Sequence, residues 1–232
     1  MFVLLGLIIG GTLGGVINKV VKQVNKLYVY AGSVILSLII LEIIPETVVS
    51  YNWIGLTISF LLGIVVMQEV HLLTESFKNY SKTNSLSFGA IFLVIAISIH
   101  NIPTGIAISS NWTNQGTTSN ELILPFIIHQ IPEGLALFLS LVGAGSAIYS
   151  TYSFISFTFL IVLCFFLALI LGEQSLFQDY RLRTIFMGIS IGSLGYVSVL
   201  ELIIKPSRTL KLTQFIQVLV LGTATVLYLC SS

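Results

Sequence analysis

The sequence predicts an all-α, polytopic membrane protein that crosses the bilayer eight times. Hydrophobic residues make up 56% of the 232 residues and charged residues only 8%, whereas a soluble domain carries about 25% charged residues. The mean hydropathy is +1.02. The net charge of +1 comes without a basic cluster, which argues against nucleic-acid binding. We therefore expect the lipid bilayer as a partner and no nucleic acid.

Eight apolar windows are long enough to cross the membrane, since a transmembrane helix needs about 20 mostly apolar residues. Their approximate limits are 2–18, 29–49, 53–70, 87–109, 121–143, 150–171, 184–204 and 212–230. Short polar segments connect the windows and leave no room for a soluble domain. We expect residues 1–232 to form a single transmembrane domain.

The basic residues are distributed unevenly between the two sides of the predicted membrane. Arg181 and Arg183 lie on one side, and the other eight of the ten lie on the opposite side: Lys19, Lys22, Lys26, Lys78, Lys82, Lys205, Arg208 and Lys211. Because basic residues concentrate in cytoplasmic loops, this asymmetry predicts that both termini lie outside the cytoplasm.

The fourth and fifth windows contain the same motif, H-x-I-P-x-G-x-A. It occupies residues 100–107 and 129–136, 29 residues apart. Ionisable groups in the middle of a span are costly and usually mark function. Consecutive spans run antiparallel, so we expect the two motifs to meet near the bilayer midplane.

The spacing within each motif places polar groups on one helix face and breaks the helix beside them. His129 and Glu133 are four residues apart and share a face. Pro103 and Pro132 have no N–H to donate and clash with the preceding turn, which predicts a kink in each helix. Broken helices at mid-membrane commonly form the ion sites of transporters.

Two imidazoles with one carboxylate suit a first-row divalent ion such as zinc, iron or manganese. Asn101 and Gln130, next to the two histidines, add oxygen ligands or hydrogen bonds to the ligands. Structural packing is the alternative interpretation. We favour a metal or proton pathway because two of the three histidines occupy equivalent places beside a proline.

An enzyme is not expected. An intramembrane metalloprotease typically carries H-E-x-x-H on one helix, whereas here Gln130 follows His129 and Pro132 interrupts the helix.

These motifs resemble those of the ZIP family of divalent metal transporters, which carries H-N-x-P-E-G in its fourth span and [HQ]-[EDQ]-x-P-E-G in its fifth. Residues 41–46 resemble the family's E-x-x-P-E in span 2, and residues 192–202 its G-x-x-x-Y-V-x-x-x-E-L in span 7. The resemblance implies a bundle of eight helices in which spans 1, 4, 5 and 6 move against the rest. It also implies uptake of a divalent ion across the cell membrane, as substrate and with no further cofactor.

Transferred to this chain, the family's metal-binding positions are His100, Asn101, His129, Gln130 and Glu133. Thr104 replaces the family's metal-bridging glutamate in span 4. The resemblance therefore implies at most one well-held ion, and it leaves open a non-transporting sensor or scaffold. The identity of the metal and the formation of a homodimer also remain open.

Three further carboxylates are candidates for an entrance or exit. Glu42 and Glu46 lie near the predicted outer end of span 2, where they could attract cations, and Glu201 lies near the cytoplasmic end of span 7. Their alternative role is that of interfacial carboxylates facing water, which is the role expected for Glu69. The sequence contains no Walker motif, so the ion gradient and the membrane potential are the expected energy sources.

Overall fold

The computed structural model describes residues 2–20, 23–50, 52–80, 85–115, 120–142, 147–174 and 179–231, and these are helical apart from short connections. The described residues contain no strand. The elements are α1 (Phe2–Val20), α2 (Val24–Leu38), η1 (Ile39–Ile43), α3 (Ile44–Ser50), α4 (Trp53–Tyr80), α5 (Ser85–Gln115), α6 (Asn120–Val142), α7 (Ala147–Gly172), α8 (Tyr180–Val197), η3 (Ser198–Ile204), α9 (Lys205–Ser207) and α10 (Leu212–Ser231).

Two of the long helices contain a π-helical segment. α2, η1 and α3 follow one another without a break, and so do α8, η3 and α9. Each of the eight predicted windows therefore coincides with one helix or one continuous helical run. In the described part of the chain, six helices are long and apolar enough to cross a membrane; α1 and α6 contribute shorter apolar stretches, Val3–Lys19 and Gln130–Val142. The count of eight spans stays a prediction.

Helix α4 is longer than the predicted span 3. The window ended at residue 70, but α4 continues to Tyr80, and α5 begins at Ser85 and runs to Gln115. The segment after residue 70 contains neither glycine nor proline, so nothing in it stops the helix where the apolar run ends. α5 and α6 also continue through Pro103 and Pro132, and their kinks stay a prediction.

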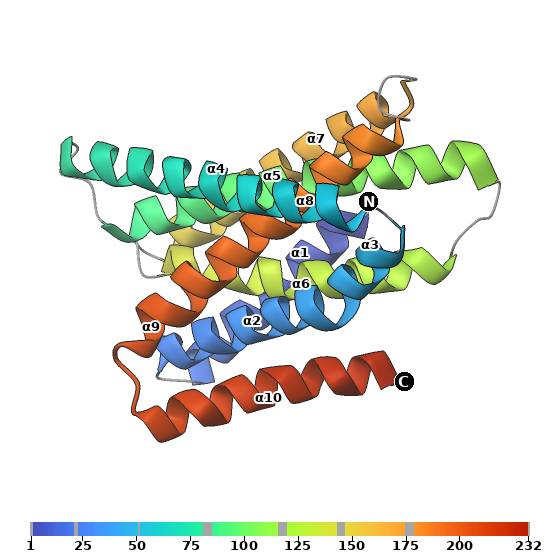
Figure 1. The fold of residues 1–232 in the computed structure, drawn as a ribbon. Helices are drawn as coiled ribbons and strands as arrows, with labels where there is room; N and C mark the ends of the chain where they lie inside the picture. Colours follow the sequence, from blue (N-terminus) through green and yellow to red (C-terminus); the bar gives the residue numbers. More distant parts are fainter. Residues whose placement is uncertain are drawn as a thin grey trace.

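The helices pack most extensively in four pairs: α1 with α6, α4 with α8, α5 with α7, and α10 with α2 (Figure 1). Further contacts of α5 with α8 and α6, and of α2 with α6 and η3, join these pairs into one bundle. Large apolar side chains are exposed along α4, α7 and α10, among them Trp53, Phe159 and Tyr228. In a chain of this composition such surfaces face lipid.

Glycines allow the closest helix contacts. A Cβ atom at Gly134 of α6 would collide with the backbone of Leu7 in α1, and one at Gly10 of α1 would collide with the backbone of Ile131 in α6. Small residues at such crossings let two backbones touch. The α1–α6 crossing is therefore a contact between two backbones.

We expect Gly134→Ala to lower the stability of the protein by about 1–3 kcal/mol, because the added methyl group overpacks a contact between two backbones. Thermal unfolding in detergent measures the change. Gly195→Ala is the matched control, since a Cβ atom there would meet no atom of the described residues within 4 Å. Equal melting temperatures for the two variants would show that the backbones of α1 and α6 lie farther apart at Gly134 than in this structure.

Candidate metal centre

Four of the five predicted ligands come together between α5 and α6. His100 and Asn101 belong to α5, and Gln130 and Glu133 belong to α6. Their exposed fractions are 4% for His100, 0% for Asn101, 0% for Gln130 and 1% for Glu133. Leu93, Ile97 and Leu137, which are also buried, belong to the same two helices. A polar layer therefore lies inside an apolar bundle, as the duplicated motif predicts.

His100 and Glu133 face each other across the layer. The Nε2 atom of His100 lies 3.6 Å from Oε1 of Glu133. A neutral imidazole nitrogen without a proton and a carboxylate oxygen are both acceptors, so they repel unless a proton or a cation lies between them. This arrangement can hold positive charge.

The two amides form a direct contact. Nε2 of Gln130 donates to Oδ1 of Asn101 at 2.9 Å. Among the described residues, Oε1 of Gln130 and Nδ2 of Asn101 have no hydrogen-bond partner. Buried polar atoms are nearly always satisfied, so a buried oxygen without a hydrogen-bond donor is a candidate ligand for a cation.

His129 and Thr104 complete the two motifs. His129 lies on α6, and its side chain falls outside the part of the structure that is described. Thr104 is half-buried, and its hydroxyl donates to the backbone oxygen of His100 at 3.2 Å. In the described part of the chain, no three His, Cys, Asp or Glu side chains gather closely enough to hold a metal ion.

Ser190 of α8 also reaches this layer, although the motifs do not predict it. Its hydroxyl lies 2.6 Å from Nδ1 of His100 and 3.0 Å from the backbone oxygen of His100. Ser190 is 1% exposed. It stands in a helix rich in glycine and serine, where nothing distinguishes it by sequence from Ser193 or Ser198.

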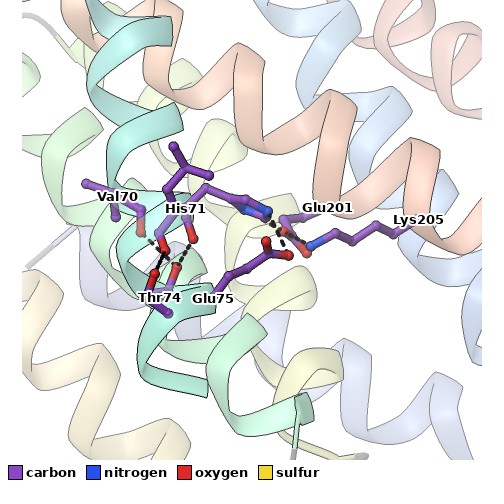
Figure 2. A network of polar contacts seen from close by, with 8 residues as sticks. Val70, His71, Thr74, Glu75, Glu201 and Lys205 are labelled. Atoms are coloured by element: carbon purple, nitrogen blue, oxygen red, sulfur yellow. Dashed lines mark hydrogen bonds and ion pairs between the residues drawn. The ribbon is translucent and has the colours of Figure 1, made fainter. Parts of the chain in front are cut away.

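A second polar cluster joins α4 to η3 and α9 (Figure 2). His71 of α4 has Nε2 3.3 Å from Oε1 of Glu75 and Nδ1 3.5 Å from Oε1 of Glu201. The ammonium group of Lys205 pairs with the same oxygen of Glu201. The imidazole therefore lies between two carboxylates, one of which also binds a lysine.

This cluster borders a cavity of about 410 Å³ that Tyr28, Thr74 and Ser140 also line. Sequence reasoning identified Glu201 as a candidate exit but missed the partners of its side chain. A signal was present, because Lys205 lies four residues after Glu201 and Glu75 lies four residues after His71.

The other candidate carboxylates are spread along the chain. Glu42 is half-buried in η1, and Glu201 is half-buried in η3, so both lie in π-helical turns, which often occur at functional sites. Glu46 lies on α3, and its side chain falls outside the described residues. Glu69 is exposed on α4.

Comparison with known proteins identifies the family. The profile of the family described as "ZIP Zinc transporter" matches residues 67–229, which is more than half of the chain. A search of curated proteins gives no match. The matched region contains both copies of the duplicated motif and the polar layer around His100. Members of this family transport metal ions across membranes and are not enzymes, and this membrane protein belongs to the ZIP family of zinc transporters.

Proposed function

We propose that this protein carries a divalent transition metal ion, such as zinc, iron or manganese, across the cell membrane into the cytoplasm. The ion is the substrate, and no further cofactor takes part. The proposed mid-membrane ligands are His100, Asn101, His129, Gln130 and Glu133. Eight spans with kinks at Pro103 and Pro132 form one transmembrane domain, with both termini outside the cytoplasm.

The observation that carries this proposal is the separation of His100 and Glu133. Their facing nitrogen and oxygen are 3.6 Å apart in a buried layer. Two ligands of one tetrahedral zinc ion lie about 3.4 Å apart when the zinc–ligand bonds measure about 2.0–2.2 Å. A small shift of either side chain would therefore let both groups bind the same ion.

The amide pair supports the same conclusion. Oε1 of Gln130 has no donor among the described residues, and the hydrogen bond from Gln130 to Asn101 links it to the residue next to His100. An amide oxygen beside an imidazole and a carboxylate gives the mixed set of ligands that several first-row divalent ions accept. The set does not distinguish among them, so the choice of metal depends on measurement.

Glu133 is the only carboxylate among the proposed ligands, which favours a single bound ion. Burying a carboxylate in an apolar bundle is costly unless a positive charge lies next to it, and a divalent ion supplies that charge. A non-transporting sensor is the second candidate function. It is favoured by Thr104, whose hydroxyl donates to the backbone of its own helix where the family has a bridging glutamate.

The four most extensive helix pairs do not cross the division between the spans that move in the family and the rest, although α5 also packs on α8 and α2 on α6 across it. α1 packs mainly on α6 and α5 mainly on α7, whereas α4 packs mainly on α8 and α10 on α2. The first set contains the spans that are expected to move in the family. Across a membrane potential of 100 mV, negative inside, a divalent ion entering the cytoplasm gains about 4.6 kcal/mol, since each charge contributes about 2.3 kcal/mol. This free energy drives uptake without ATP.

We expect proteoliposomes containing the wild-type protein to accumulate zinc, iron or manganese. Glu133→Gln and His129→Ala should each lower the uptake rate at least about tenfold, because each removes a ligand while leaving the ion equally costly to desolvate. Uptake of a radioactive or fluorescently reported metal measures the rate, and competition among the metals identifies the preferred one.

Glu69→Gln is the matched control for Glu133→Gln, because it makes the same change at an exposed position on α4. It should transport at the wild-type rate. If the folded wild-type protein carries no metal and the variants behave identically, the non-transporting function is correct.

We expect Thr104→Glu to bind metal more tightly or to bind a second ion, because it adds a carboxylate one turn after His100. Equilibrium dialysis with metal analysis measures affinity and stoichiometry. Thr104→Gln controls for the size of the side chain without its charge. Unchanged affinity and stoichiometry in Thr104→Glu would show that position 104 does not face the ion.

A further inference from the structure

Ser190 contributes no ligand to the proposed metal site, yet its hydroxyl contacts a ligand at two points. It lies 2.6 Å from Nδ1 and 3.0 Å from the backbone oxygen of His100. We propose that Ser190 is a positioning residue that keeps the imidazole proton of His100 on Nδ1, so that Nε2 presents its lone pair to the metal ion. This inference rests on the proposed function for its purpose, while the tautomer can be tested without transport.

The number of hydrogen atoms determines the direction of both bonds. A serine hydroxyl has one proton to donate, and a backbone carbonyl oxygen can only accept. When a metal ion binds Nε2, the imidazole proton is on Nδ1, so Nδ1–H donates to the Ser190 oxygen at 2.6 Å and the hydroxyl proton of Ser190 goes to the backbone oxygen at 3.0 Å.

The proton on Nδ1 has a direct consequence for the opposite side of the ring. A neutral imidazole carries one proton, so Nε2 is left with its lone pair. Nε2 is the atom that faces Glu133 at 3.6 Å. Divalent metals bind the unprotonated nitrogen of a neutral imidazole. The hydroxyl of Ser190 therefore directs the metal-binding nitrogen toward the carboxylate, away from α8.

The contact also fixes where the ring lies. Ser190 is on α8 and His100 is on α5, and both are buried, with exposed fractions of 1% and 4%. The two bonds hold the ring and the backbone of the same residue, so the ring has little freedom to rotate away. Removing an interaction of this kind from a metal-binding histidine typically weakens metal affinity about 10- to 100-fold.

Nitrogen-15 NMR of the zinc-loaded protein tests the tautomer. The chain has three histidines, which can be told apart by substituting them one at a time. In the wild type at pH 8, we expect the proton of His100 on Nδ1 and none on Nε2. In Ser190→Ala, we expect a mixture of both tautomers, together with zinc affinity reduced about 10- to 100-fold. Ser190→Thr, which keeps the hydroxyl, should restore the wild-type tautomer and affinity.

Ser198→Ala is the matched control, because Ser198 is also buried and, within the described part of the chain, its hydroxyl donates to the backbone of Leu194 in its own helical run. It should leave the His100 signals and the zinc affinity unchanged. A proton on Nε2 in the wild type, or unchanged His100 signals in Ser190→Ala, would overturn the proposal. Failure of the wild type to transport metal would instead refute the proposed function and leave the tautomer result standing.

Discussion

The need to satisfy polar groups inside an apolar bundle governs the centre of this protein. His100, Asn101, Gln130 and Glu133 are almost completely removed from solvent. Lipid and apolar side chains offer such groups no hydrogen bonds, so each must find a partner on a neighbouring helix. The contact from Gln130 to Asn101 joins α6 to α5, and further polar contacts join these helices to each other and to α8.

The close packing of helix backbones and the polar contacts at the centre of the bundle depend on different residues. Gly134 lets the backbone of α6 touch that of α1, and Gly192 of α8 does the same against Phe60 of α4. These contacts bind helices within pairs. Polar side chains then connect α5, α6 and α8 across the boundary between pairs. Packing of α5 on α8 and of α2 on α6 crosses the same boundary, so the polar contacts lie within an extended interface between helices.

Periodicity and motif spacing predict a large part of this arrangement. Hydropathy locates the long helices of the described residues, since a long apolar run that spans lipid is helical. The repeat of the motif after 29 residues predicts that α5 and α6 bring polar groups together, and Asn101 and Gln130, which occupy equivalent positions, do form a hydrogen bond. Helix ends are predicted less well. The apolar run of α4 ends before the helix does, because the following residues include no glycine or proline that would end it.

Contacts between distant helices are beyond the reach of the sequence alone. Ser190 lies 90 residues from His100, and only the packing of α8 against α5 makes it a neighbour. His71 and Glu201 likewise meet because α4 packs on α8 and its continuation. Spacing along one helix indicates which residues share a face. It does not indicate which face of another helix they meet.

The cluster around Glu201 limits how a cation can use the cavity at that end of the bundle. Glu201 already holds the ammonium group of Lys205, and His71 lies between Glu201 and Glu75 (Figure 2). An incoming dication would therefore compete with the ammonium group of Lys205 for this carboxylate. In this structure the counter-ion of Glu201 is therefore Lys205, four residues further along the same helical run.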